Sequence, residues 1–151
     1  MTLYLDTSSL VKLYVEEAGS DLVRRLVADA TVVVSSVVAY PEARAAFARL
    51  RRERALSSPA FVGIKRVFER QWSSYLSLQA TEAVCRAAGE LAEAYGLRGF
   101  DSLHLASYAE VVRRSVAGDV EFSSFDDRLN DAVRKLKRKL PRRSSRPRSP
   151  W

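Results

Sequence analysis

The sequence predicts an α/β fold in which a central parallel sheet is covered by helices on both faces. Short apolar runs rich in β-branched or aromatic residues alternate with longer segments of helical periodicity. Two of these runs stop at a carboxylate and turn directly into a helix, as a buried strand does when it enters its crossover. Strands that alternate with helices form parallel sheets with right-handed crossovers, so the pattern favours a three-layer α/β/α arrangement.

The first strand, helix pair and second strand are expected within the first 36 residues. Residues 2–6 form an apolar run that ends at a carboxylate, and residues 8–17 carry apolar side chains on one helical face. Gly19 is expected to close that helix, and residues 21–29 continue with helical spacing. The β-branched run at residues 31–36 predicts a strand buried on both faces.

The next helix is expected to run through residues 39–54. Pro41 either occupies its first position or kinks a helix that starts earlier, near Ser36. Both alternatives place Glu42 in the early turns of the helix. Residues 55–63 are expected to form a loop.

The second half of the chain predicts four more helices and one more strand. Apolar side chains recur at helical spacing in residues 64–75, 84–95, 100–114 and 125–136. Residues 120–124 predict the last strand and lead into the last of these helices. No internal repeat and no second domain is evident, so residues 1–140 are expected to form a single domain.

Composition and cysteine usage indicate a cytoplasmic protein. The chain has 151 residues, of which 47% are hydrophobic, enough to bury a substantial core. Its one cysteine, Cys85, cannot form an intramolecular disulfide and is interpreted as a small buried apolar residue. The N-terminal residues lack the features of a secretory signal, and no apolar run approaches the ~18 residues that a membrane span needs.

The positive charge is concentrated at the C-terminal end. The net charge is +7, but nine of the 25 basic residues lie in residues 134–151, where no acidic residue occurs. Residues 1–133 therefore hold 16 basic against 18 acidic residues, a net charge of −2. Residues 141–151 are rich in Pro, Ser and Arg, and we expect them to form a disordered basic tail.

Four acidic residues occupy comparable positions at the strand ends or helix starts: Asp6, Glu42, Asp101 and Asp126. The carboxyl ends of parallel strands meet at one edge of the sheet, where the functional crevice of such folds lies. Each residue alone is more simply a helix cap or a solvated charge. Together, carboxylates held close raise one another's pKa unless a cation compensates them, and Mg²⁺ or Mn²⁺ prefers such oxygen ligands.

Four blocks of the sequence resemble the PIN-domain ribonucleases, and specifically the toxins of VapBC toxin–antitoxin pairs. They occur in family order along residues 1–130: "LYLDTSSLVKLYVEEAGS", "SSVVAYPEARAAFARL", "LRGFDSLHLASYA" and "FSSFDDRL". The resemblance implies a three-layer PIN-like fold and a metal-dependent endoribonuclease that hydrolyses RNA phosphodiester bonds. It also implies inhibition by a cognate VapB-like antitoxin, and a homodimer.

The resemblance assigns Asp6, Glu42, Asp101 and Asp126 as the catalytic, metal-binding set. Ser8 and Ser124 then supply hydroxyls near the Mg²⁺ or Mn²⁺ ion. The family often has Thr at the position of Ser124, which keeps the hydroxyl. The family also usually ends with a short apolar strand after the last helix, and no apolar run here predicts it, so the pattern leaves open whether that strand is present.

Alternative interpretations concern particular residues and the acidic set as a whole. His104 is more simply a buried, hydrogen-bonded core histidine than a catalytic one. A phosphatase with an Asp nucleophile would need a second Asp two residues after Asp6, where this chain has Ser8. A catalytically inactive PIN-like binding module, acting through a protein partner or the basic tail, would be marked by a missing acidic ligand, and all four are present.

Overall fold

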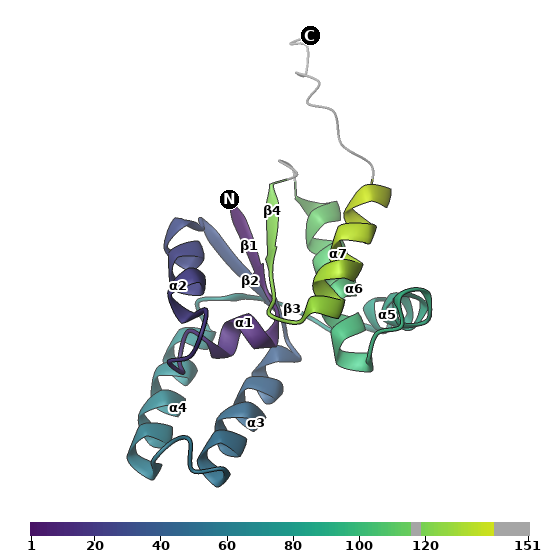
Figure 1. Ribbon diagram of the computed structural model, residues 1–151. Coiled ribbons are helices and arrows are strands. Elements are labelled where there is room, and N and C mark those ends of the chain that lie inside the picture. The colour runs from purple at the N-terminus through teal and green to yellow at the C-terminus, as the bar shows by residue number, and fades with distance from the viewer. Residues whose placement is uncertain (116–118, 141–151) are drawn as a thin grey trace.

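A parallel sheet with the strand order β3-β2-β1-β4 forms the centre of the computed structural model, which describes residues 1–115 and 119–140 (Figure 1). Every pairing in it is parallel. The strands are β1 (Thr2–Leu5), β2 (Val32–Ser36), β3 (Leu76–Leu78) and β4 (Val120–Ser123). The predicted α/β class and the central parallel sheet are confirmed.

Helices cover both faces of this sheet (Figure 1). The helices before β3 lie on one side: α1 (Thr7–Val11), α2 (Ser20–Asp29), α3 (Ala39–Arg52) and α4 (Ser58–Trp72). Those after β3 lie on the other: α5 (Glu82–Tyr95), α6 (Gly99–Arg114) and α7 (Asp127–Lys139). The helical layer on one face therefore comes from the chain before β3, and the layer on the other face comes from the chain after it.

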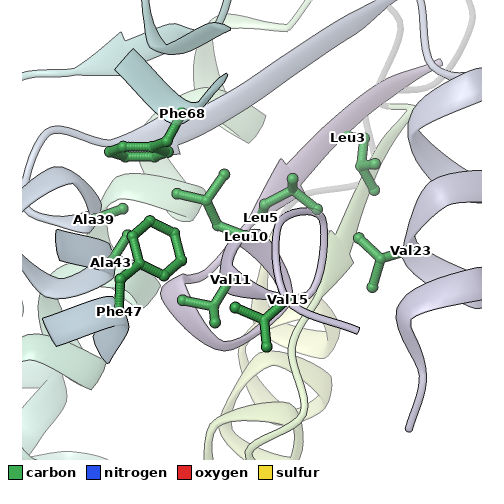
Figure 2. Close-up of a cluster of buried hydrophobic side chains, with 10 residues drawn as sticks. All are labelled: Leu3, Leu5, Leu10, Val11, Val15, Val23, Ala39, Ala43, Phe47 and Phe68. Carbon is green, nitrogen blue, oxygen red and sulfur yellow. The ribbon is translucent and has the colours of Figure 1, made fainter. Parts of the chain in front are cut away.

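β1 is buried on both faces because its side chains alternate between the two layers. Leu3 and Leu5 belong to the core formed with α1 to α4 (Figure 2), in which Phe47 and Phe68 meet edge to face at 5.5 Å between ring centroids. Tyr4 points to the opposite layer, where it is fully buried. One short strand thus links the two cores.

The second core surrounds Tyr4. Its ring stacks on Phe122 of β4 at 5.4 Å between centroids and meets Tyr108 of α6 edge-on at 5.9 Å. Leu105 of α6 and Leu129 of α7 are fully buried in the same cluster. These contacts fix α6 and α7 against the sheet and so set where their first turns lie.

Several element boundaries differ from the sequence prediction. The first helix ends at Val11, and the chain continues in tight turns, so Gly19 does not close it but stands before α2 with φ +93°. Pro41 is the third residue of α3 and not its first, and the helix begins at Ala39 rather than near Ser36. Residues 58–63, expected as loop, form the first turns of α4, since the Ser57 side chain caps that helix.

Two differences concern strands. β3 was not predicted, because three residues are too few to display an alternating pattern. β2 is buried only in its second half, and Val32 at its start is 41% exposed, so the predicted burial on both faces does not extend along the whole strand. The final strand that the family resemblance raised, and the tail at residues 141–151, lie outside the described residues.

The order of the strands also locates a crevice. From β1 the chain moves outward through β2 to β3, and then returns across the sheet to place β4 on the other side of β1. In open α/β sheets, ligands bind outside the carboxyl ends of the strands where the order changes direction in this way. Asp6, which follows β1, and Ser124, which follows β4, lie at that point.

Candidate active site

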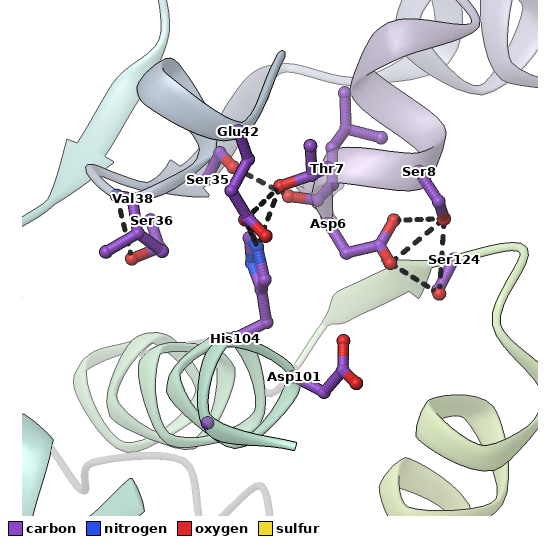
Figure 3. A network of polar contacts seen from close by, with 12 residues as sticks. Asp6, Thr7, Ser8, Ser35, Ser36, Val38, Glu42, Asp101, His104 and Ser124 are labelled. Atoms are coloured by element: carbon purple, nitrogen blue, oxygen red, sulfur yellow. Dashed lines mark hydrogen bonds and ion pairs between the residues drawn. The ribbon is translucent and has the colours of Figure 1, made fainter. Parts of the chain in front are cut away.

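Asp6 is the buried centre of the site (Figure 3). It caps α1 by accepting a hydrogen bond from the backbone N–H of Ser9 at 2.9 Å. Two hydroxyls also donate to its carboxylate, Ser8 Oγ at 2.7 and 2.9 Å and Ser124 Oγ at 2.6 Å. The residue is only 4% exposed. Ser8 and Ser124, expected near the metal, therefore hold the side chain of Asp6 from two sides.

The environment of Asp6 disfavours its negative charge. Burial raises the pKa of the Asp6 carboxyl, and the hydrogen bonds from Ser124, Ser9 and Ser8 compensate only in part. A carboxylate held in this state gains from a nearby cation, which would stabilise the ionised form that burial penalises.

Glu42 is held by a second hydrogen-bond network, at the start of α3 (Figure 3). The Thr7 hydroxyl donates to Glu42 Oε2 at 2.5 Å, and His104 Nε2 lies 3.0 Å from the same oxygen. The other ring nitrogen, His104 Nδ1, is 3.1 Å from the Tyr4 hydroxyl. When Tyr4 donates to Nδ1, the imidazole proton lies on Nε2 and is directed at Glu42.

This network keeps Glu42 ionised. Burial alone would raise the pKa of the Glu42 carboxyl, but the hydrogen bonds from His104 and Thr7 lower it below its ordinary value. The expectation that His104 is a buried, hydrogen-bonded residue is confirmed, since it is 2% exposed. The sequence did not reveal its contact with Glu42, which is 62 positions away along the chain.

Asp101 and Asp126 face each other across a guanidinium group. Arg98 Nε lies 3.0 Å from Asp101 Oδ2, and the Arg98 Nη2 atom lies 3.7 Å from Asp126 Oδ2. Asp126 also caps α7 by accepting from the N–H of Leu129 at 2.8 Å. The two carboxylates are partly open to solvent, with side chains 21% and 31% exposed.

Sequence reasoning missed Arg98. A signal was present, because a basic residue three positions before an acidic one at a helix start can form a pair across one turn. The Arg98 side chain is 77% exposed, and its ion-pair partners among the described residues are these two carboxylates.

The four acidic residues share one edge of the sheet. Thr7, next to Asp6, binds Glu42, and Ser124 links Asp6 to the junction that carries Asp126 by accepting from the Asp126 N–H at 3.0 Å. Asp101 joins them from the first turn of α6, through Arg98. Within residues 1–115 and 119–140, however, no group of three or more His, Cys, Asp or Glu side chains is close enough to form a ready-made metal cage.

A cavity of about 700 Å³ adjoins these carboxylates. Glu42, Arg98 and Asp101 line it together with Phe100 and one face of α5. Cys85 belongs to that face and is exposed, so the prediction of a buried cysteine is wrong. Val84 and Ala88 pack against α6. Because successive helix residues are turned by about 100°, Cys85 points away from that contact and towards the cavity.

Residues 3–133 match the model of the PIN domain family. This chain belongs to the PIN domain family. Two curated relatives are "Ribonuclease VapC45" of Mycobacterium tuberculosis strain CDC 1551 / Oshkosh and "Ribonuclease VapC49" of Mycobacterium tuberculosis strain ATCC 25618 / H37Rv. Each is 39% identical over 104 residues, which cover 69% of this PIN domain chain and 72% of the relative.

A solved structure shares the PIN fold of this chain. It is the crystal structure of Mycobacterium tuberculosis VapC20, described as a Sarcin-Ricin loop cleaving toxin, with a TM-score of 0.61 and 20% sequence identity. The match covers 86% of this chain and 94% of that one. The sequence resemblance to PIN-domain ribonucleases and the three-layer fold are thereby confirmed. None of the helices in the part of the chain that the structure describes combines the length and apolar character needed to cross a membrane.

Proposed function

We propose that this PIN domain is an endoribonuclease toxin that hydrolyses RNA phosphodiester bonds with a divalent cation, Mg²⁺ or Mn²⁺. The observation that carries the proposal is the buried Asp6 carboxylate, held by two serine hydroxyls at the sheet edge that also bears Glu42, Asp101 and Asp126. Both curated relatives are named as ribonucleases, which supports the same chemistry.

The donor set fits a hard divalent cation. Carboxylate oxygens are the ligands that Mg²⁺ and Mn²⁺ prefer, and Mg²⁺ keeps several waters, so a complete protein cage is not required. Arg98 lies between Asp101 and Asp126 and compensates their negative charges, as a bound cation at the same place would. Asp6, Glu42, Asp101 and Asp126 would hold the ion, directly or through water. The bound ion would supply an activated water and positive charge at the phosphate.

The side chains of this chain prepare the site for that chemistry. Ser8 and Ser124 fix the orientation of the Asp6 carboxylate, and His104 with Thr7 holds Glu42 in its ionised form. Because residues 1–133 carry a net charge of −2, RNA must be attracted by local basic groups. The exposed guanidinium of Arg98, beside the carboxylates, is positioned to contact a phosphate.

Replacing a carboxylate with its amide tests the metal site. We expect Asp6→Asn and Asp101→Asn to lower RNA cleavage by orders of magnitude, because each keeps the side-chain shape and removes a charged ligand. Asp29→Asn, an exposed acidic residue at the end of α2, is the matched control and should cleave normally. Cleavage is measured on labelled RNA with Mg²⁺ or Mn²⁺, and EDTA should abolish it.

Two results would contradict this assignment. Cleavage at the wild-type rate by Asp6→Asn would mean that the ion, if any, binds elsewhere. A folded wild-type protein that binds Mn²⁺ but cuts no RNA would instead favour the inactive binding module.

We further propose that a VapB-like antitoxin binds this PIN domain and blocks the site, and that the domain forms a homodimer. Exposed apolar side chains occur on the early helices, Leu22 on α2 and Val62 on α4, each 47% exposed. They suit an amphipathic helix laid along the domain, with an Arg directed at the carboxylates. Co-expression with the neighbouring small reading frame should yield a stable complex without nuclease activity, and light scattering should give the mass of a toxin dimer. Separate elution of the two proteins would count against the partner.

A further inference from the structure

The cavity beside the carboxylates has a chemistry that metal binding does not explain. Its volume of about 700 Å³ lies within the range of small-molecule sites, about 300–1,000 Å³. Most of its lining is apolar, with Phe100 on the α6 side and Ala88, Gly89 and Ala92 on the α5 side. We propose that this cavity binds one unpaired base of the RNA, stacked on the ring of Phe100. The inference rests on the proposed ribonuclease function and states how one base of the RNA substrate is bound.

Phe100 contributes an exposed aromatic ring to the lining of this cavity. It is the second residue of α6 and is 55% exposed, directly before Asp101. Aromatic rings on single-stranded RNA-binding proteins act as platforms for bases, with little dependence on sequence, because every base has a π face. A base on this ring would lie beside the carboxylates, next to the phosphate to be hydrolysed.

The polar rim of the cavity also suits a nucleotide. Arg98, two residues before Phe100, offers a planar guanidinium that can stack or contact phosphate. Glu42 and Asp101 lie on the same rim. A purely apolar occupant, such as a side chain of a partner protein, would leave this aromatic and charged combination unused.

The opposite wall leaves room for a flat group. A Cβ atom built on Gly89 would meet no atom within 4 Å, so the space above that helix position is open. Because Gly89 lines the cavity, a larger side chain at this position would project into the cavity and occupy part of it. Since Gly is a poor helix former, such a change should not weaken α5.

The single cysteine provides a direct probe of occupancy. Cys85 is exposed and lines this cavity, and the chain has no other cysteine. Its rate of reaction with DTNB can be measured on the full-length protein with Mg²⁺ present. AMP is the probe ligand and ribose 5-phosphate, which lacks the base, is its control. Neither contains a phosphodiester, so the measurement does not depend on cleavage.

We expect AMP to slow the modification of Cys85 several-fold and ribose 5-phosphate to leave it unchanged. Phe100→Ala should raise the half-saturating concentration of AMP by roughly 5- to 150-fold, the range for loss of one stacked base. Phe100→Trp should retain protection, and Phe100→Leu, apolar without a π face, should lose most of it. Leu76→Ala, at an exposed apolar residue of β3 outside this cavity, should behave as wild type.

A filled cavity gives the second test. Gly89→Leu should abolish AMP protection, whereas Gly63→Leu, at an equally open helical glycine outside the cavity, should not. Equal protection by ribose 5-phosphate, or unchanged AMP protection in Phe100→Ala and Gly89→Leu, would overturn the base site and leave the cavity to a protein side chain. If the wild-type protein shows no metal-dependent RNA cleavage while AMP still protects Cys85, only the proposed ribonuclease function is overturned. Failure of the base site and failure of the proposed function are therefore distinguishable.

Discussion

Replacing Gly19 with Ala should damage both the fold and the site. Gly19 has φ +93°, a conformation that L-residues rarely adopt. A Cβ there would lie 2.4 Å from one ring carbon of Phe125 and 2.6 Å from another. Phe125 follows Ser124, its backbone N–H donates to Ser8 Oγ at 2.8 Å, and Lys12 Nζ lies 4.4 Å from its ring centroid. A Cβ at position 19 therefore forces the 40% exposed ring of Phe125 to turn away, which breaks its contact with Lys12 beside the loop that holds Asp6.

The magnitude follows from two contributions. The backbone strain of a non-glycine residue at this φ costs about 1 to 3 kcal/mol, offset in part by about 0.4–1 kcal/mol from the stiffer unfolded chain. Displacing Phe125 loses its contact with Lys12, worth about 0.5–1 kcal/mol, as well as apolar packing. We expect the free energy of unfolding to fall by about 2 to 3 kcal/mol in Gly19→Ala.

Gly96 supplies the matched control. It also has a positive φ, +63°, but a Cβ there would meet nothing within 4 Å. Gly96→Ala should therefore cost only the strain, about 1 kcal/mol. Urea unfolding followed by circular dichroism measures both variants, and RNA cleavage measures the effect on the site. Equal losses in the two variants, or no coupling between Gly19→Ala and Phe125→Ala in a double-mutant cycle, would refute the reasoning.

The remaining predictions concern pH and the tail. Burial raises the pKa of Asp6, so in EDTA the folded state gains stability from protonation as the pH falls through that pKa. Asp6→Asn should therefore raise the Tm at neutral pH, and the difference in Tm from wild type should become smaller in acid. The pKa of Glu42 is lowered despite its burial, so Glu42→Gln should lower the Tm at neutral pH, and that difference should vanish as the pH falls through the Glu42 pKa. Tm shifts of equal sign in Asp6→Asn and Glu42→Gln would show that the two pKa directions are wrong. Deleting residues 141–151, which hold four arginines, should leave the unfolding midpoint unchanged while weakening RNA binding and flattening the slope of log affinity against log salt by up to about 3; identical slopes would mean that the tail does not contact RNA.

Local signals in the sequence were sufficient for the acidic residues. The apolar run of β1 ends at Asp6, and helix-start signals place Glu42 and Asp101 in first turns, as the structure has them. Asp126 caps α7 as its position suggested. Such positions depend on strand and helix periodicity within a few residues, so they can be predicted without knowing the tertiary packing.

Features set by contacts between distant segments could not be predicted in this way. β3 is defined by its pairing with β2, and its three residues are too few to predict a strand from the sequence. The exposure of Cys85 depends on which face of α5 meets α6. The tie between His104 and Glu42 requires that α6 and α3 meet at the sheet edge, which the separate motifs do not show. These features determine how the acidic residues are held, whereas the local pattern determines only where they lie.

The position of β4 in the sheet has a consequence for how the protein is made. β1 pairs with β2 on one side and with β4 on the other, and the hydrogen bond from Ser124 to Asp6 joins residues 118 positions apart. Until β4 has been synthesised, the growing chain therefore has an unpaired edge on its first strand and an aspartate that lacks its serine partner. This edge of the sheet therefore closes only after the segment containing β4 has left the ribosome. If the site is the proposed nuclease, the strand order delays its assembly until that point.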